Sequence, residues 1–301
     1  MEKRCILHFL SPLKNVSPFD VNMAVDAGYD VVVPYTDVDL KEVSGLAQDA
    51  MFSRPPDDAK RTAILIGGRD PLLAVDMFEA AKTAMFPPFQ LSVLVDPSGA
   101  FTTAAAMVAV AEWQLKQQGL DLAGRRVAVF GATGPVGAIA GLIAAKAGAK
   151  VTLVGYDGLQ RVTATAEAFG ERFGVALSPA DGSDDAKKLR VLEGAEVVLA
   201  AGRAGARILS KEQLATAKKL RVAIDVNAVP PSGIEGIDAF DDGKPIEGTS
   251  GVGIGALAVG NVKFKTEHEL LASMRDAEKP LYLSFAEAFE VARKHAQKNA
   301  K

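Results

Sequence analysis

The residues that decide the fold are Gly131-Ala132-Thr133-Gly134-Pro135-Val136-Gly137, which follow the apolar run 127–130 and precede an alanine-rich segment. Glycines between a strand and a helix let the backbone approach a pyrophosphate, whose charge faces the free N–H groups of the helix start. The spacing is G-x-x-G-x-x-G, so the strict G-x-G-x-x-G fingerprint is absent. We still predict a Rossmann-type dinucleotide site rather than a purely structural turn. Its expected contacts are Gly131, Thr133, Gly134, Pro135, Val136 and Gly137.

A second part of this site is expected where the next strand ends. Asp157 lies about 20 residues beyond Gly137, a position at which a carboxylate binds the ribose hydroxyls and repels a 2′-phosphate. Tyr156 precedes it, and Arg161 follows one helical turn later, within reach of a 2′-phosphate. We therefore predict NAD as the cofactor, with NADP as an accepted alternative. In the contrary interpretation, this segment is only a solvated helix start.

Short apolar runs alternate with helix-type segments, which predicts an α/β protein with two domains and parallel sheets. Strands are expected at 5–10, 30–34, 63–66, 91–95, 126–130, 150–154, 196–200 and 222–226. Helices are expected at 71–85, 102–118, 135–147, 159–173, 211–217, 266–275 and 284–297, with no strand between the last two. A glycine-rich loop over 229–260 is expected to be functional, with a linker as the alternative.

Composition limits the classes of function. The 301 residues include 34 basic and 37 acidic side chains, a formal net charge of −3, so we expect no nucleic-acid partner and no anionic membrane surface. The single Cys5 excludes an internal disulfide, and no Cys/His cluster has zinc spacing, so we predict no metal site. Neither a signal peptide nor a membrane helix is predicted. We expect a cytoplasmic protein with small-molecule ligands.

Longer stretches make the interpretation specific. They are Thr133–Gly137, Asp96-Pro97-Ser98-Gly99-Ala100-Phe101-Thr102-Thr103-Ala104-Ala105-Ala106 and Asp225-Val226-Asn227-Ala228-Val229-Pro230-Pro231-Ser232-Gly233-Ile234. Shorter matches lie at 18–20, 67–70, 255–257 and 263–265. Together, over nearly the whole chain, they resemble the NAD(P)-dependent methylenetetrahydromethanopterin dehydrogenases of one-carbon metabolism, a family that serves formaldehyde oxidation.

This resemblance implies an oxidoreductase with an N-terminal α/β domain for a pterin substrate and a Rossmann domain for NAD(P). We place the first domain at residues 1–118, completed by the C-terminal helices in 256–301, and the Rossmann domain at 119–255. A homo-oligomer is expected, because the alanine-rich helices of a cleft enzyme often pack against copies of the same chain. Ala132 and Tyr156-Asp157 depart from stricter nucleotide patterns in the family, and these departures concern cofactor preference alone.

The family reaction moves a hydride from the carbon that bridges two pterin nitrogens to the nicotinamide, and leaves a methenyl cation. Because the nitrogen lone pairs stabilise this cation, no proton has to move in the hydride step. The resemblance therefore implies a site that depends on placement and electrostatics rather than on a general acid or base. We expect His8, His268 and His295 to be structural or solvent-facing.

Four charged residues are the catalytic candidates. Asp20 and Asp96 follow strands of the first domain, where a carboxylate can bind the amino-pyrimidine edge or favour the developing cation. In the alternative, Asp20 caps a helix near Val21 and Asp96 braces the turn after it. Lys263 and Lys265 are candidates for orienting the pterin carbonyl or a carboxylate, and their alternation with apolar residues equally suits a short strand with a solvated face.

Three further residues are candidates for substrate binding. Thr102 and Thr103 stand at a predicted helix start, so one is expected to be the N-cap and the other to contact the substrate. Asn227 follows a Rossmann strand and is assigned either to the nicotinamide side of the site or to an Asx turn before Pro230.

Other functions compete with this interpretation. A methylenetetrahydrofolate dehydrogenase has the same reactive centre in its substrate, and the nucleotide motifs do not separate the two carriers. A shikimate- or quinone-type oxidoreductase needs an acid/base Lys–Asp pair or a quinone site, and neither is evident. A redox sensor that binds the dinucleotide without catalysis has no use for a second ligand site.

Overall fold

The computed structural model describes residues 3–298, and the chain divides into two compact units. Unit 1 comprises Met1–Thr102 and Phe264–Val291, and unit 2 comprises Thr103–Lys263 and Ala292–Lys301. Helices α5 (Ala100–Gln117), α10 (Ala256–Asp276) and α11 (Phe285–Lys298) each contribute residues to both units. The functional domain limits at 118 and 255 stay a prediction.

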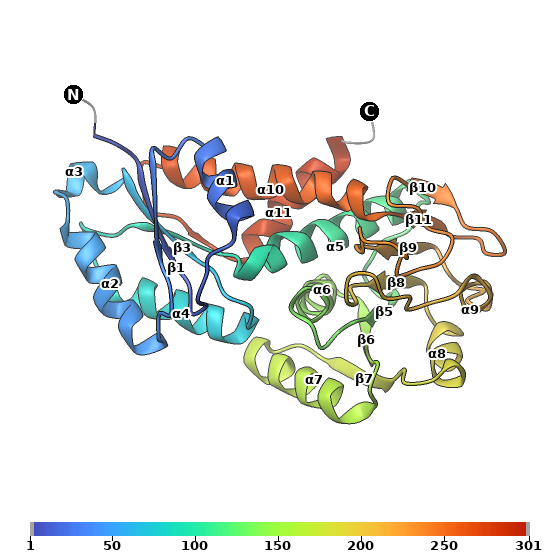
Figure 1. The fold of residues 1–301 in the computed structure, drawn as a ribbon. Helices are drawn as coiled ribbons and strands as arrows, with labels where there is room; N and C mark the ends of the chain where they lie inside the picture. The colour runs from blue at the N-terminus through green and yellow to red at the C-terminus, as the bar shows by residue number, and fades with distance from the viewer. Residues whose placement is uncertain (1–2, 299–301) are drawn as a thin grey trace. The chain divides into compact units, whose positions relative to one another are not determined.

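Unit 1 is built on a five-stranded parallel sheet with the strand order β12-β4-β3-β1-β2. Its strands are β1 (Ile6–Leu10), β2 (Val31–Tyr35), β3 (Thr62–Ile66), β4 (Ser92–Val95) and β12 (Tyr282–Leu283). Its other helices are α1 (Pro18–Asp26), α2 (Leu40–Phe52), α3 (Pro56–Ala59), α4 (Pro71–Ala84) and the 3-10 turn η1 (Pro97–Gly99). Helices α2 and α4 lie together on one face of this sheet and α1 lies on the other (Figure 1).

The order of strands in unit 1 determines where a ligand can enter. The chain leaves β1 toward β2 on one side, whereas β3 and β4 lie on the other side of β1. Such a reversal opens a crevice at the carboxyl ends of the strands. The loops after β1 and β3 both begin there, and the second leads into α4, whose first turn is capped by Asp70.

Unit 2 contains a seven-stranded sheet with the order β10-β11-β9-β8-β5-β6-β7, parallel except for β10. Its strands are β5 (Arg126–Phe130), β6 (Lys150–Gly155), β7 (Leu177–Asp181), β8 (Val197–Ala200), β9 (Val222–Asp225), β10 (Asp242–Pro245) and β11 (Val252–Ile254). Its other helices are α6 (Pro135–Lys146), α7 (Leu159–Phe173), α8 (Asp185–Leu192) and α9 (Lys211–Ala215). The predicted α/β class with parallel sheets and a Rossmann unit is confirmed.

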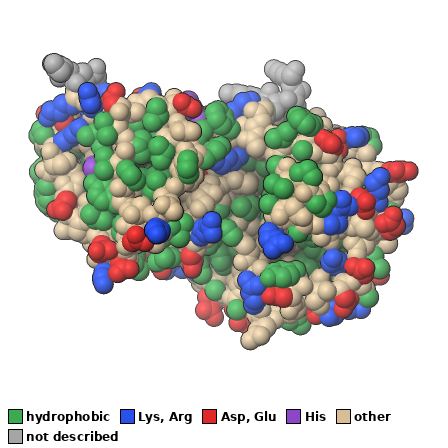
Figure 2. Space-filling view, in the orientation of Figure 1, with side chains coloured by type: hydrophobic (Ala, Val, Ile, Leu, Met, Phe, Trp, Pro, Cys, Tyr) green, Lys and Arg blue, Asp and Glu red, His purple; other side chains and the backbone are tan. Residues whose placement is uncertain are grey.

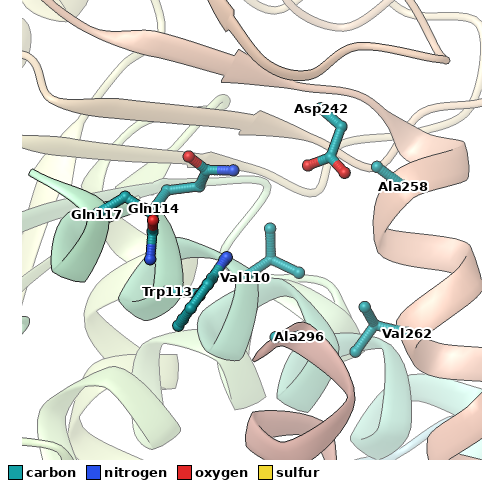
Figure 3. A pocket seen from close by; sticks show the side chains of 8 residues that line it. All are labelled: Val110, Trp113, Gln114, Gln117, Asp242, Ala258, Val262 and Ala296. Atoms are coloured by element: carbon teal, nitrogen blue, oxygen red, sulfur yellow. The ribbon is translucent and has the colours of Figure 1, made fainter. Parts of the chain in front are cut away.

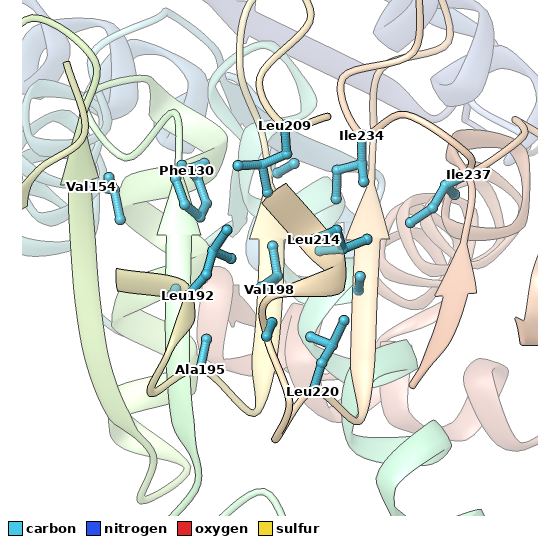
Figure 4. Close-up of a cluster of buried hydrophobic side chains, with 14 residues drawn as sticks. Phe130, Val154, Leu192, Ala195, Val198, Leu209, Leu214, Leu220, Ile234 and Ile237 are labelled. Atoms are coloured by element: carbon cyan, nitrogen blue, oxygen red, sulfur yellow. The ribbon is translucent and has the colours of Figure 1, made fainter. Parts of the chain in front are cut away.

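A buried apolar cluster fixes α8 and α9 against one face of this sheet. Figure 4 shows Leu192 and Leu214 pointing toward Phe130 and Val198 on the strands. Each of these four side chains is at most 3% exposed. The cluster spans β5 and β8, which are parallel neighbours. After β5 the chain adds β6 and β7 on one side, and it then adds β8 and β9 on the other side, so the cluster packs at the point where the order of strands reverses. The carboxyl edge of the sheet at β5 and β8 is therefore anchored by packing below it.

Several predicted elements differ in the structure. The last two helices are separated by β12, which pairs with β4, so the expectation of no intervening strand is wrong. Two residues are too short a run to show an alternating pattern. Helix α10 begins at Ala256 rather than near 266, and the glycine-rich loop contains β10 and β11. Strand β7 was not predicted, because it is an edge strand that contains Pro179.

The surface agrees with the small net charge. Basic and acidic side chains are intermixed over the face shown in Figure 2. Among residues 3–298, no helix is both long enough and apolar enough to span a membrane.

Candidate functional site

Unit 2 contains a cavity of about 690 Å³ at the carboxyl ends of its strands. Its walls come from the loops after β5, β6, β7 and β8. The predicted cofactor residues that line it are Gly131, Thr133, Gly134, Pro135, Tyr156 and Arg161. Val136 and Gly137 lie just beyond, in the first turn of α6, and Asp157 lies beside Tyr156. A single cavity thus gathers both predicted parts of the dinucleotide site.

Two glycines shape the floor of this cavity. Gly131 has φ +77°, and a Cβ there would collide with the carbonyl oxygen of Ala201, at the end of β8. A Cβ on Gly137 would collide with the carbonyl of Gly131. Without these two side chains the turn closes tightly, with the Gly134 N–H donating to the Gly131 carbonyl at 3.0 Å, and the first N–H groups of α6 face the place of a pyrophosphate. The residues present therefore fit a dinucleotide.

The predicted ribose subsite contains a closed pair of opposite charges. Arg161 donates hydrogen bonds to the Asp157 carboxylate at 2.8 Å and to the Tyr156 hydroxyl at 3.1 Å. Its guanidinium lies 5.8 Å from the centre of the Tyr156 ring. The hydrogen bond to Asp157 raises the pKa of Arg161, so the cation persists at all ordinary pH values. The subsite presents both a carboxylate for ribose hydroxyls and a cation for a phosphate.

Further cations line the same cavity that the sequence analysis did not single out. Lys188 donates to the Ile208 carbonyl at 2.9 Å, and Arg207 is paired with Glu235 at 3.0 Å. Arg203 stands in the loop after β8. The sequence did contain a signal for Arg203, which lies between Gly202 and Gly205 just after the strand predicted at 196–200. Lys188 lies in α8, after β7. Because β7 was not predicted, nothing in the sequence indicated that Lys188 lies at this edge of the sheet.

Unit 1 contains a separate cavity of about 370 Å³ at the carboxyl ends of β1, β3 and β4. Asp20 lines it and is 3% exposed. Asp20 lies in the first turn of α1, whose cap is Ser17, so the alternative of Asp20 as a cap near Val21 is wrong. The other residues around the opening include Phe9, Ser11, Asn15, Arg69 and Ser98. An aromatic ring, a buried carboxylate and a cation thus share one pocket.

Asp96 is bound to the start of the next helix. Its carboxylate accepts hydrogen bonds from the backbone N–H groups of Phe101 at 2.8 Å and Thr102 at 3.3 Å. The Thr102 hydroxyl donates to its second oxygen at 2.5 Å, and Asp96 and Thr102 are 3% and 0% exposed. The helix begins at Ala100, so Thr102 is not its N-cap, and the alternative in which Asp96 braces the turn describes these contacts.

The backbone between Asp96 and this helix is strained. Ser98 has φ +52° and ψ +38°, a left-handed conformation that a side chain other than glycine seldom adopts. Its hydroxyl donates a 2.6 Å hydrogen bond to the Gly68 carbonyl. Nearby, a Cβ on Gly67 would stand 2.7 Å from the Phe9 ring. These constraints fix the loop after β3 at the mouth of the cavity of unit 1.

Asn227 braces the loop after β9. Its side-chain oxygen accepts from the N–H groups of Gly205 at 3.2 Å and Val229 at 3.0 Å, and its amide donates to the Pro231 carbonyl at 2.9 Å. Asp225 holds the same loop by accepting from Asn227 and Ile234, and burial raises its pKa. The Asx-turn alternative therefore describes Asn227, because its amide is already engaged.

The remaining candidates lie on helices. Lys263 and Lys265 are half-buried residues of α10, so the alternative of a short strand is wrong. Residues two apart on a helix do not face one another, so the two ammonium groups do not act side by side. Thr103 is half-buried in α5. A smaller cavity of about 150 Å³ in unit 2, lined by Trp113, Gln114, Asp242 and others, includes none of the predicted site residues (Figure 3).

Comparisons with known proteins give a consistent result. Residues 18–98 match the family model described as methylene-tetrahydromethanopterin dehydrogenase, N-terminal. The chain is similar to the NAD(P)-dependent methylenetetrahydromethanopterin dehydrogenase of Methylorubrum extorquens, with 49% identity over 290 residues that cover 96% of this chain and 98% of the relative. It is also 32% identical over 266 residues to the bifunctional protein MdtA of the same organism, covering 88% of this chain and 90% of that protein.

Among solved structures, the NAD-dependent malic enzyme of Thermotoga maritima superposes with a TM-score of 0.53 at 13% identity. The match covers 96% of this chain and 84% of that one. At this identity the likeness concerns the fold alone.

Proposed function

Because this chain belongs to the NAD(P)-dependent methylenetetrahydromethanopterin dehydrogenase family, we propose that it oxidises methylenetetrahydromethanopterin to the methenyl form. The observation that carries this proposal is the 49% identity to a relative of that name, which extends over 96% of the chain. NAD is the proposed hydride acceptor, and NADP is proposed as an accepted alternative.

The cavity of unit 2 is the proposed dinucleotide site. A bound nicotinamide supplies the hydride acceptor for the reaction. The glycine turn and the first turn of α6 hold the pyrophosphate, since the first N–H groups of a helix have no partner within it. Tyr156, Asp157 and Arg161 hold the adenosine ribose. Arg161 keeps its hydrogen bond to Asp157 when a ribose hydroxyl binds, and it exchanges that bond for one to the phosphate when a 2′-phosphate binds.

The cavity of unit 1 is the proposed pterin site. Phe9 contributes an apolar wall, and Asp20 offers a buried carboxylate that suits the donor edge of an amino-pyrimidine. The same charge favours the cation that forms as the hydride leaves. Asp96 and Thr102 are proposed to act together from outside the cavity, because their hydrogen bond supports the turn that carries Ser98. Lys263, Lys265 and Thr103 stay proposed substrate contacts, and Asn227 is proposed to act by bracing the loop after β9.

Histidine chemistry is not part of the proposal. His8 is hydrogen-bonded to the Tyr35 hydroxyl at 3.1 Å, and burial lowers its pKa. It is therefore neutral at pH 7 and carries no charge into the reaction. His268 lies 3.3 Å from the Asp26 carbonyl, outside both cavities. Placement of the two reactants and fixed charge remain as the sources of rate enhancement.

The test is a comparison of initial rates. Purified protein is mixed with NAD and equal concentrations of methylenetetrahydromethanopterin or methylenetetrahydrofolate, and the absorbance of the reduced cofactor is followed. The proposal expects faster reduction with the methanopterin carrier. Faster reduction with the folate carrier would make the chain a methylenetetrahydrofolate dehydrogenase, and no reduction with either would leave a dinucleotide sensor. Sedimentation of the same sample tests the proposed homo-oligomer.

A further inference from the structure

Arg69 occupies a fixed position at the rim of the cavity of unit 1. The residue before it, Gly68, has φ +123°, and its carbonyl accepts the 2.6 Å hydrogen bond from the strained Ser98. The residue after it, Asp70, caps α4 by accepting from the N–H groups of Leu72 at 2.9 Å and Leu73 at 3.2 Å. The backbone on both sides of Arg69 is therefore held, and the start of its side chain is held with it.

The guanidinium at the end of this side chain is available to a ligand. Arg69 is exposed and lines the cavity, and among residues 3–298 no carboxylate forms an ion pair with it. Other arginines of unit 1 are engaged: Arg275 is bound to Asp276 at 2.7 Å, and Arg54 donates to the Arg4 and Arg61 carbonyls. An arginine with a fixed backbone and a free planar donor group is suited to a carboxylate or a phosphate.

The charges of the cavity are separated along its depth. Asp20 is buried, whereas Arg69 stands at the exposed rim of the same pocket. Like charges repel at close range, so a guanidinium beside a forming cation slows the reaction. The reacting carbon therefore belongs on the side of Asp20. The rim belongs to a part of the substrate that carries negative charge.

We propose that Arg69 binds the acidic tail of the one-carbon carrier, and that this contact directs the pterin head toward Asp20. This inference rests on the proposed function, since it assumes a reduced pterin in this cavity. The recognised chemistry is an oxyanion, a carboxylate or phosphate, at a distance from the reacting carbon. Ser98 is the positioning residue that keeps the Gly68-Arg69 segment at the rim. Arg69 then determines which carriers bind well rather than how fast the bound carrier reacts.

The test combines two variants of the full chain with two substrates. One substrate is methylenetetrahydromethanopterin, and the other is the same carrier truncated to its reduced pterin and aryl amine, without the acidic end of the tail. For the Arg69→Met protein we expect KM for the full carrier to rise about 10- to 100-fold, as for the loss of a charge-assisted hydrogen bond, with kcat nearly unchanged. Arg69→Lys should recover part of the loss. With the truncated carrier, the wild-type and Arg69→Met proteins should have the same KM.

Controls separate this effect from general ones. Lys41→Met removes one positive charge from an exposed site of α2 outside the cavity and should leave KM for both carriers unchanged. The Kd of NAD should be equal in wild type and Arg69→Met, which shows that the protein is folded and that Arg69 does not bind a cofactor phosphate. An equal loss on the full and truncated carriers, or a loss of NAD affinity, would overturn the inference. If the wild-type protein oxidises neither carrier, the proposed function fails. The Kd of the reduced carrier for the wild type and for Arg69→Met then decides the role of Arg69, because equal Kd values would overturn the inference.

Discussion

Asp157 follows the end of β6, Arg161 lies in the first turn of α7, and the two form an ion pair of 2.8 Å. The Asp157 carboxylate, which favours NAD by repelling a 2′-phosphate, is thus partly neutralised by Arg161, which can bind a 2′-phosphate. Arg161 is 57% exposed, so the pair itself contributes little to stability and its partners can exchange. This relationship gives a structural basis for the proposal that the site takes NADP as well as NAD.

Replacement of Asp157 should shift cofactor choice. In Asp157→Ser the repulsion of a 2′-phosphate disappears and Arg161 is released to bind it, so the ratio of kcat/KM for NADP to that for NAD should rise about tenfold or more. Adding a basic residue at Tyr156 should increase the shift. Steady-state kinetics with both dinucleotides measure the ratio, and Arg161→Gln should lower it. An unchanged ratio in Asp157→Ser would remove the ribose assignment.

Gly131 should be essential for dinucleotide binding, and Gly124 gives a matched control. Both have a left-handed backbone, with φ +77° and +78°, but a Cβ on Gly124 meets open space, whereas one on Gly131 meets the Ala201 carbonyl. Each alanine variant should carry a backbone strain of about 1 kcal/mol. Only Gly131→Ala should also weaken NAD, by at least tenfold in a titration. Equal affinities in the two variants would show that the turn does not hold the cofactor.

Asp96→Asn should affect both stability and rate. The amide keeps the shape of the side chain but loses one acceptor oxygen, so the Thr102 hydroxyl or an N–H group of the helix start loses its partner. We expect the free energy of unfolding to fall by about 1–2 kcal/mol. We also expect turnover to fall by a factor on the order of ten to a thousand, through the loss of fixed charge near the pterin site. Denaturant titration and kinetics measure the two effects, and full activity at reduced stability would limit Asp96 to a capping role.

His8 should make stability depend on acid without affecting catalysis. Because burial lowers its pKa in the folded state, the unfolded chain binds the proton more readily. The free energy of unfolding is therefore unaffected by His8 above the unfolded pKa, about 6.5, and it decreases as the pH falls below that value. His8→Gln should flatten this part of the stability profile. The single-turnover rate of hydride transfer should be nearly constant between about pH 6 and 8 in both proteins, and a steep titration abolished by His8→Gln would reveal a general base.

The sequence predicted well those features that depend on local pattern. The glycine spacing at 131–137 and the apolar strands each leave a signal within a few residues, and each is present. Asp157 and Arg161 are four residues apart, and they pair although Asp157 lies in the turn before α7 and only Arg161 lies in the helix.

Other features depend on contacts that no local pattern encodes. Strand β12 exists because Tyr282 and Leu283 reach β4, nearly 190 residues earlier in the chain. The hydrogen bond between Ser98 and Gly68 joins two loops beside Arg69, at a cavity that the sequence does not outline. Asp96 and Asn227 were found as polar residues at strand ends, but only the structure shows that their side chains are bound to neighbouring backbone.

The central claim is direct transfer of a hydride from the methylene carbon to the nicotinamide, and isotopic labelling tests it most directly. The carrier is prepared with deuterium on its methylene carbon and oxidised by the protein with NAD in ordinary water. We predict that the reduced cofactor retains one deuterium per turnover and that the single-turnover rate shows a primary isotope effect. Reduced cofactor without deuterium, or with label exchanged into the solvent, would show that a proton moves in the step and would contradict this account.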